Sequence, residues 1–406
     1  MRKVSILSSM LVVFFITNLI GQIDSQWRGP ERDGIYPGEK LLKKWPADGP
    51  KVLWSFESLG DGYSSAAVTK DRVYATGMLD DTGYLFAFDF KGKLLWKSAY
   101  GREWTENYEG ARTTPTIAGS KIYLMSAFGE VFCFDTKGKK LWSVDLMAEY
   151  GARNIRWGFT ESLLVDGDRV FCTPGASNVM FMALNRHTGK VIWKTKGSGQ
   201  KSAYCSPCIV KHGSRRIIIT MTAEAVAGID ADKGGFLWEA EHKTKYDINP
   251  NTPLYKDGYI CTSSGYGTTG TQMFKLSADG TKISRVWINE APDVHHGGLV
   301  LADGYLFGSG HDEKGWHCLD WKTGKLQFTS REIGRKGNLI FADGMIYCYS
   351  EKGHAALVKP NSKKFEIVSQ FKFKKGTGQH WAHSVIKEGR LYMRRGNALV
   401  VYDISR

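Results

Sequence analysis

One short unit recurs along the chain and limits the folds that this sequence can adopt. In residues 183–193, a strand that contains the small residue Ala183 leads through a turn at Gly189 into a second strand that ends at Trp193. Such turns favour glycine, which adopts a positive φ at little steric cost. Matching units close at positions 96, 142, 193, 238, 287 and 328, so their spacing is 41–51 residues. A period of 40–50 residues built from short strands is typical of a β-propeller.

The two ends of the chain indicate how the ring closes. Residues 52–56 read as a strand that carries Trp54, but no repeat precedes it, and residues 382–403 supply three strands of a repeat without a closing strand. Pairing these two fragments leaves no open sheet edge. The six repeat units, this strand and the strand at residues 365–368 together give eight blades, and the sequence predicts an all-β protein. We expect an eight-bladed β-propeller of four-stranded antiparallel blades over residues 51–406, closed by pairing an N-terminal strand with the C-terminal blade.

Two segments precede the predicted ring. Residues 1–21 begin with Arg2 and Lys3 and continue as an apolar run, which is typical of an export signal peptide, although an uncleaved anchor is the alternative. We therefore expect a periplasmic or extracellular protein with no stable membrane span after signal removal. Residues 22–50 contain four prolines and four glycines, which predicts an extended segment. We expect it to wrap the outside of the ring with Trp27, Tyr36 and Trp45 as anchors.

The chain is basic, with a formal net charge of +14. Such a charge favours polyanionic partners such as acidic polysaccharide, lipid headgroups or nucleic acid. Export argues against nucleic acid. Many of the lysines lie scattered in turns, as at Lys91, Lys137, Lys190 and Lys325, which indicates a role in solubility rather than a binding stripe.

The repeat unit resembles a known motif. Its pattern of Ala, any residue, Asn or Asp, then Thr-Gly and a closing Trp is similar to the tryptophan-docking motif of the pyrroloquinoline-quinone repeat family. This resemblance covers residues 51–406. It implies that each Trp packs between neighbouring blades over a small residue such as Ala87, Cys133, Ala183 or Cys318. The family contains both quinoprotein alcohol dehydrogenases and cofactor-free assembly proteins of the BamB type, so fold alone does not give function.

A propeller brings equivalent positions of all blades around one axis, and ligands bind where such a ring closes on a funnel. Nearly every repeat carries a large polar or aromatic residue just before its innermost strand. Aromatic faces with Arg and His donors suit a flat, anionic or sugar-like ligand. The alternative is that these side chains fill the channel and satisfy one another. The candidate ligand-binding residues are Tyr63, Arg112, Arg156, Trp157, Tyr204, Asn249, His295, His296, His380, Trp381 and His383.

Carboxylates near the same rim are the candidate catalytic groups. Glu161 and Asp293 have the chemistry of a general base or a calcium ligand, while the alternative is a salt bridge to a neighbouring arginine such as Arg156. Adjacent residues on a strand point to opposite faces, so we expect that His295 and His296 do not chelate one ion together. The sequence therefore predicts hydrogen-bonding histidines and no metal site.

The seven cysteines argue against a dehydrogenase site. The quinoprotein dehydrogenases of the family carry adjacent cysteines that form a disulfide against the quinone, and this chain has no Cys-Cys pair and no Cys-x-x-Cys-His motif. Cys205 and Cys208 lie about 10 Å apart if the strand between them is extended, which exceeds disulfide reach. We expect all seven to be structural thiols. The cofactor that the resemblance implies is pyrroloquinoline quinone with calcium, and no set of calcium ligands can be placed on this sequence.

Two hypotheses follow. The first is an exported binding or scaffolding module that binds a partner protein, or a carbohydrate or other small polar or anionic ligand, on its funnel face. The second is a quinone-dependent alcohol or sugar oxidoreductase. The ring of aromatic and imidazole groups favours both, and the missing cysteine pair counts against the second.

Overall fold

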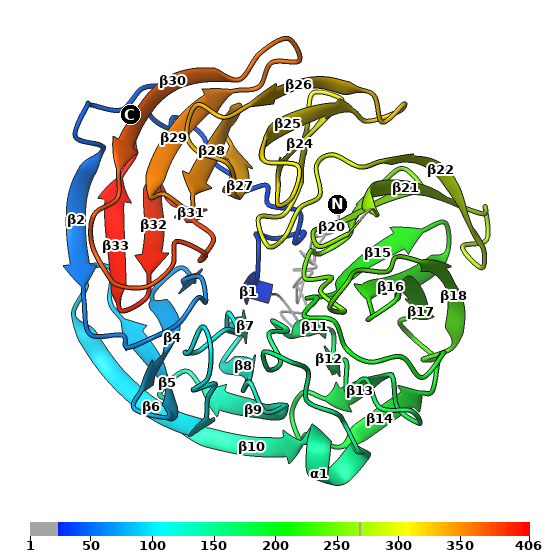
Figure 1. Cartoon of the computed structure of the whole chain (residues 1–406). Coiled ribbons are helices and arrows are strands. Elements are labelled where there is room, and N and C mark those ends of the chain that lie inside the picture. Colours follow the sequence, from blue (N-terminus) through cyan, green and yellow to red (C-terminus); the bar gives the residue numbers. More distant parts are fainter. Residues whose placement is uncertain (1–22, 268) are drawn as a thin grey trace, which may run out of the picture.

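The repeats form a closed ring of eight sheets (Figure 1). The computed structural model describes residues 23–267 and 269–406. The predicted all-β, eight-bladed propeller with antiparallel blades is confirmed. Within these residues the structure has one helix, α1 (Leu146–Tyr150), capped by Asp145 and ended by Gly151 at φ 68°. The export signal predicted for residues 1–21 lies outside the described residues.

Each blade is an antiparallel meander whose first strand is innermost. The first four blades consist of β3 (Ala67–Val68), β4 (Val73–Leu79), β5 (Thr82–Phe88) and β6 (Leu94–Arg102); β7 (Thr116–Ala118), β8 (Lys121–Met125), β9 (Glu130–Asp135) and β10 (Lys140–Asp145); β11 (Leu164–Asp166), β12 (Arg169–Cys172), β13 (Phe181–Asn185) and β14 (Val191–Thr195); and β15 (Cys208–His212), β16 (Arg215–Met221), β17 (Ala225–Asp230) and β18 (Phe236–Glu241). The next three consist of β19 (Leu254–Lys256), β20 (Tyr259–Ser264), β21 (Gly270–Leu276) and β22 (Ile283–Asn289); β23 (Val300–Ala302), β24 (Tyr305–Gly310), β25 (Gly315–Asp320) and β26 (Leu326–Ser330); and β27 (Gly337–Ala342), β28 (Met345–Ser350), β29 (His354–Lys359) and β30 (Glu366–Lys372).

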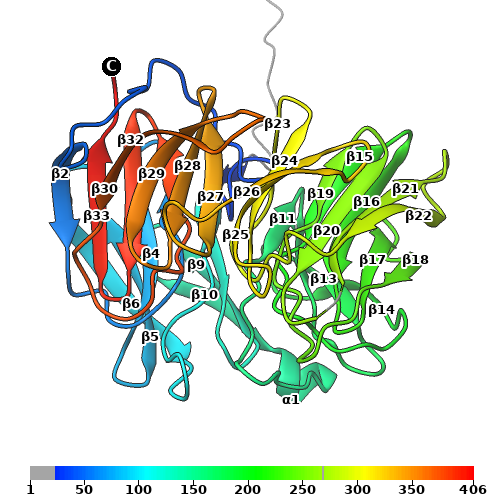
Figure 2. The ribbon, with the colours of Figure 1, turned by 45° about the horizontal axis from the view of Figure 1, so that its top comes forward.

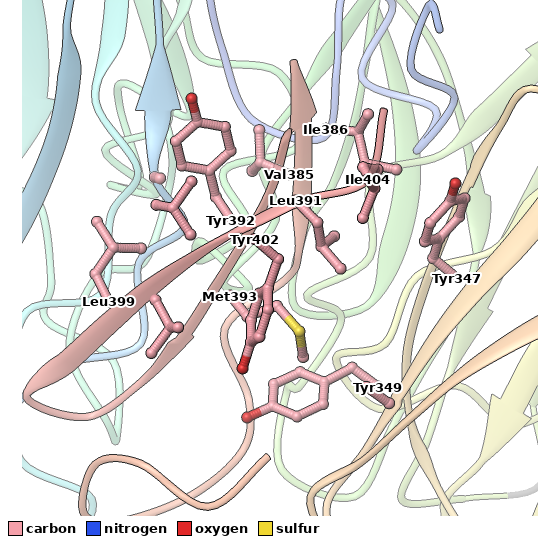
Figure 3. Packing of buried hydrophobic residues seen from close by; sticks show 14 of the residues in the cluster. Tyr347, Tyr349, Val385, Ile386, Leu391, Tyr392, Met393, Leu399, Tyr402 and Ile404 are labelled. Carbon is pink, nitrogen blue, oxygen red and sulfur yellow. The ribbon is translucent and has the colours of Figure 1, made fainter. Parts of the chain in front are cut away.

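The eighth blade joins the two ends of the sequence. It consists of β31 (Val385–Lys387), β32 (Arg390–Arg395), β33 (Ala398–Asp403) and the outer strand β2 (Lys51–Phe56). β2 pairs with β33 from Lys51 opposite Asp403 to Phe56 opposite Leu399. The predicted closure is therefore confirmed, and the core between the last two blades, with Tyr347 and Met393, is continuous across it (Figure 3).

Tryptophans of the repeat fasten each blade to the next one. Trp96 lies opposite Ala87 in its own blade and packs on Gly138 of the following blade, where a Cβ would come within 2.8 Å of the indole. Trp142 and Trp238 add a hydrogen bond from the indole nitrogen to a turn carbonyl of the next blade, each at 3.2 Å. The packing that the resemblance implied is thus present.

The N-terminal segment does not run as expected. β1 (Ile23–Ser25) pairs with β7 as an additional innermost strand and lies at the centre of the ring (Figure 1). Residues 26–34 occupy the channel, and residues 35–45 cross the face opposite to α1 before the chain reaches the outer strand β2 (Figure 2). The prediction that Trp27 anchors an outer wrapping was therefore wrong, because buried arginines tie this part of the segment to the channel wall.

Arg28 and Arg32 hold the segment in the channel. Arg28 donates hydrogen bonds to the carbonyl of Leu299 at 2.7 Å and to Nδ1 of His383 at 2.9 Å. Arg32 donates to the carbonyls of Ser162, Leu163 and Pro207. The two arginines thus satisfy backbone carbonyls of innermost segments from blades on different sides of the ring, where an unpaired buried carbonyl would be destabilising.

Candidate functional site

A cavity of about 250 Å³ lies on the propeller axis and opens on the face that carries α1. The loops that enter the innermost strands and the turns between second and third strands surround it, so each blade can contribute a side chain. Trp27 of the N-terminal segment lines its inner part, and its indole donates to Thr252 at 3.2 Å. The lining residues are Trp27, Tyr63, Tyr108, Arg112, Trp157, Thr160, Ser162, Tyr204, Ser206, Ile248, Pro250, Tyr266, His295, His296, Lys336, Trp381 and His383.

Eight aromatic and imidazole rings form a continuous series at this cavity; seven of them line it, and Tyr246 contacts Tyr266 and Trp157 without lining it. Successive ring centroids are 4.6–6.3 Å apart, within the range of favourable aromatic contacts. Arg112 extends the series, because its guanidinium lies 5.7 Å from the centroid of Tyr63. We call these rings the aromatic collar; in order they are Tyr63, Trp381, His296, His295, Tyr266, Tyr246, Trp157 and Tyr204.

Glu351 organises one side of the collar. One of its carboxylate oxygens accepts from the indole of Trp381 at 2.9 Å and lies 3.2 Å from both His296 Nε2 and Lys336 Nζ. Burial acts to raise the pKa of Glu351, but the hydrogen bonds from His296 and Lys336 outweigh it and lower the pKa to about 2. Glu351 is therefore ionised at neutral pH, and the ammonium of Lys336 is its cationic partner.

The histidines of the cavity are neutral at pH 7. Burial lowers the pKa of His295, His296 and His383 below the ordinary histidine range. Nε2 of His383 lies 2.7 Å from the carbonyl of His296 and therefore donates, which leaves Nδ1 free to accept from Arg28. The imidazoles thus serve as hydrogen-bonding and stacking groups rather than as charges.

The expectation that His295 and His296 point to opposite faces was wrong. Both rings line the cavity, with their centroids 4.6 Å apart. They lie in a bend before β23 rather than on a strand, so the alternation of side chains along a strand does not apply to them.

Three cavity tyrosines have a strained backbone. Tyr108, Tyr204 and Tyr266 have φ angles of 59°, 71° and 63°, in the left-handed region that side chains other than glycine rarely adopt. Such a conformation costs about 1–2 kcal/mol per residue. Strain of this kind concentrates at functional sites, since the surrounding structure must maintain it.

Most of the candidate ligand-binding residues lie together at the cavity. Eight of the candidates line it, namely Tyr63, Arg112, Trp157, Tyr204, His295, His296, Trp381 and His383. Arg156 lies beside it and stacks 5.0 Å from the centroid of Trp157. Asn249 is fully buried and donates to the carbonyls of Thr222, Ala223 and His242, outside the lining. His380 also lies outside the lining, where its Nδ1 pairs with the Tyr349 hydroxyl at 2.6 Å.

The two candidate carboxylates are buried in the walls of the blades. The oxygens of Asp293 accept from the backbone N–H groups of residues 311–313, which fixes the turn between β24 and β25. Glu161 accepts from the backbone N–H of Thr173 at 3.0 Å, and burial raises its pKa to about 8. Neither carboxylate is among the residues that line the cavity, and among the described residues their hydrogen bonds come from backbone N–H groups and not from Arg156.

Several cavity residues have no signal in the repeat pattern. Tyr108 and Tyr266 come from irregular connections, Glu351 follows β28, and Trp27 belongs to the segment expected outside. Lys336 is the exception, because it directly precedes β27, at the position where nearly every repeat carries a large polar or aromatic residue.

The comparisons with known proteins agree with this architecture. The family model described as outer membrane protein assembly factor BamB matches residues 81–330. The chain belongs to this family. No curated protein sequence matches it significantly.

Solved propellers of two kinds resemble the BamB-family chain in fold. BamB from Moraxella catarrhalis is 14% identical, with a TM-score of 0.62, and the match covers 87% of this chain and 99% of that one. Quinohemoprotein alcohol dehydrogenase from Comamonas testosteroni is 10% identical, with a TM-score of 0.65 and coverage of 93% and 79%. A europium-containing methanol dehydrogenase is 13% identical, with a TM-score of 0.63 and coverage of 87% and 86%. At these identities the resemblance concerns the fold.

The cavity of this BamB-family chain does not fit a calcium-bound quinone. Calcium takes oxygen ligands, chiefly carboxylates, yet no Asp or Glu is among the lining residues. Glu351, at its edge, already accepts from three donors. Within residues 23–267 and 269–406, no group of three or more His, Cys, Asp or Glu side chains is placed to hold a metal. All seven cysteines are buried free thiols.

No helix among the described residues combines the length and the apolar character needed to cross a membrane.

Proposed function

We propose that the protein is an exported binding module whose axial cavity takes a small ligand with a flat or sugar-like ring. The aromatic collar is the observation that supports this function. Seven of its rings line a cavity that also carries cationic and hydroxyl-bearing side chains, and aromatic faces of this kind pack against the apolar face of a sugar or against a planar ring. The ring centroid of Trp381 lies 5.0 Å from that of Tyr63 and 5.0 Å from that of Tyr108.

The backbone strain of three tyrosines that line the cavity supports a binding role. Tyr108, Tyr204 and Tyr266 hold a left-handed backbone that costs about 1–2 kcal/mol per residue, and strain of this kind is found at functional sites. No Asp or Glu lines the cavity, and the lining groups with the chemistry of a general base are His295, His296 and His383, so the support for binding comes from the aromatic collar.

A titration of the purified protein tests this function. Neutral and acidic oligosaccharides serve as probes, with tryptophan fluorescence and calorimetry as readouts. We expect binding by the parent protein and a loss of at least about tenfold in affinity in Trp381→Ala, which corresponds to about 1.4 kcal/mol. Absence of saturable binding by every saccharide, or equal affinity in Trp381→Ala, would overturn the proposal.

A second titration tests the oxidoreductase alternative. Pyrroloquinoline quinone with calcium is added, and dye reduction is followed with alcohols and aldoses. We expect neither tight binding nor turnover. Micromolar quinone binding with turnover would overturn the binding-module proposal in favour of the enzyme.

A protein partner is the second candidate function, because several outer strands expose apolar side chains. Leu95, Ile192 and Ile288 are 43–49% exposed on β6, β14 and β22, at the rim of the ring. Such residues on edge strands suit pairing with a segment of another protein. Crosslinking of a partner in the native host that is lost in Ile288→Lys and retained in Trp381→Ala would support this role, and the opposite pattern would exclude the rim.

A further inference from the structure

A second cavity, of about 290 Å³, lies beside the axial one and shares Tyr204 with it. Three connections form its walls: the loop that carries Arg156 before β11, the loop that carries Lys201 before β15, and the loop that carries Lys245 before β19. Tyr204 is therefore a partition with the aromatic collar on one side and this second cavity on the other.

The second cavity is rich in uncompensated positive charge. Arg156, Lys201 and Lys245 line it together with a single carboxylate, Asp247. Among the described residues, no ion pair within 4.0 Å involves any of the four side chains. Lys243, two residues before Lys245, shows the contrast, because it lies 3.4 Å from Glu224 and 3.5 Å from Glu241.

Aromatic contacts hold two of the three cations, Arg156 and Lys245, in place. The guanidinium of Arg156 lies 5.0 Å from the ring centroid of Trp157 and 5.3 Å from that of Tyr246, and the ammonium of Lys245 lies 5.2 Å from Tyr246. Cation–π contacts orient such groups without neutralising them, so their N–H donors stay available to an anion. Trp157 and Tyr246 also belong to the aromatic collar, so the basic cavity, defined by Arg156, Lys201 and Lys245, begins where the collar ends.

We infer that the ligand is an acidic saccharide, whose ring stacks in the axial cavity while its carboxylate or sulfate group enters the basic cavity past Tyr204. This inference rests on the proposed function and adds the chemical class of the ligand. A sugar ring matches the mixture of aromatic faces with the hydroxyl-bearing residues Thr160, Ser162 and Ser206 in the axial cavity. The acidic group of the ligand matches the second cavity, where three cationic side chains face one carboxylate.

Matched pairs of oligosaccharides test the inference. Oligogalacturonate is compared with its methyl ester, and a sulfated carrageenan oligosaccharide with its desulfated form, so that the two members of each pair share the sugar backbone and differ in the acidic group. We expect one acidic form to bind at least about tenfold more tightly than its neutral partner, with an affinity that falls as salt is raised from about 50 to 300 mM. In the variant Arg156→Gln/Lys201→Gln/Lys245→Gln this preference disappears.

A variant of equal charge separates the basic cavity from the field of the whole protein. Lys91→Gln/Lys137→Gln/Lys325→Gln removes three positive charges from exposed turns at the outer rim. We expect this variant to keep the preference for the acidic form. Because all six side chains are exposed, melting temperatures close to that of the parent verify that both variants are folded.

The possible results are distinct. Equal affinity for acidic and neutral forms, or a preference that survives in the basic-cavity variant, overturns the acidic-ligand inference and leaves the proposed function standing. Competition by ATP that is stronger than any saccharide overturns the saccharide class. No binding by any saccharide overturns both proposals.

Discussion

The indole nitrogen of Trp381 donates to a carboxylate oxygen of Glu351 at 2.9 Å. Trp381 precedes the innermost strand of the eighth blade, and Glu351 follows β28 in the seventh, so this bond joins two blades at the wall of the axial cavity. The same oxygen pairs with His296, which precedes β23, the innermost strand of the sixth blade. One carboxylate thus orients rings from two blades toward a common centre.

Replacing Glu351 tests this role. Glu351→Gln removes the charge that holds Lys336 and His296, and we expect a loss of about 1–3 kcal/mol in unfolding free energy, together with weaker saccharide binding. Because the folded pKa lies at about 2, below the ordinary value of 4.5, the carboxylate stabilises the fold above pH 4.5, and this contribution is lost as pH falls toward 2. Denaturant titrations at pH 7 and pH 3 should therefore show a smaller difference between parent and variant at pH 3. An equal difference at both pH values would contradict the pKa direction.

Replacing Arg28 tests whether the N-terminal segment is part of the fold. Its guanidinium donates to several acceptors from different blades, and burial lowers its pKa to about 10, so it stays charged at pH 7. Gly34 and Gly298 make room for it, because a Cβ at either position would meet its terminal nitrogens within 2.3 Å. Lysine has one nitrogen and cannot supply this fork. We expect Arg28→Lys to destabilise the protein by about 2–4 kcal/mol in urea unfolding.

Arg153→Lys is the matched control, since Arg153 is exposed. Its stability should lie within about 0.5 kcal/mol of the parent. Equal unfolding midpoints for the two lysine variants would mean that the Arg28 guanidinium adds nothing to the stability of the ring.

The sequence predicts the ring well because propeller geometry is periodic. A small residue such as Ala87 must face its Trp at the same step in each repeat, and the strand before Trp54 must find an edge to pair with, so blade number and closure follow from spacing. The position just before each innermost strand also places Trp157 and Trp381 correctly at the cavity.

The remaining site residues depend on contacts that spacing does not encode. Asn249 and His380 lie just before innermost strands, as the repeat pattern requires, yet both pair with groups of the preceding blade and not with the cavity. Tyr108 and Tyr266 come from connections without a repeat register. The path of residues 26–34 through the channel depends on Arg28 and Arg32 meeting carbonyls that exist only after the ring has closed.

Tyr108 offers a test of strain at the cavity. Its side chain is 49% exposed, its φ is 59°, and its ring lies 5.0 Å from Trp381. Tyr108→Gly relieves a backbone cost of about 1 kcal/mol and loses little packing, so we expect thermal stability to be unchanged or slightly raised. Affinity for the saccharide should fall severalfold. A clear loss of stability would show that Tyr108 has a packing role instead.

Closure of the ring predicts a difference between two adjacent residues of β2. Trp54 is 9% exposed, packs on Gly92 and donates to the carbonyl of Phe90 at 3.1 Å, whereas Leu53 is 38% exposed. We expect Trp54→Ala to cost about 3–5 kcal/mol and Leu53→Ala less than about 1 kcal/mol in unfolding free energy. Similar losses in both variants would indicate that the outer strand does not latch the eighth blade.

Glu161 predicts a pH dependence of stability that runs opposite to that of Glu351. Burial raises its folded pKa to about 8, against an ordinary value of 4.5. Between these two pH values the unfolded chain releases the proton while the folded protein retains it, so the folded state binds more protons and stability falls as pH rises, by up to about 1.4 kcal/mol per pH unit. Glu161→Gln removes this proton, and the stability of the parent relative to the variant should decline from pH 5 to pH 8. The buried histidines, whose lowered pKa values act in the opposite direction, cancel in that difference. Parallel curves of unfolding free energy against pH for the two proteins would show that Glu161 is ionised in its buried site, and would require a cationic partner such as Arg32 to stabilise that charge.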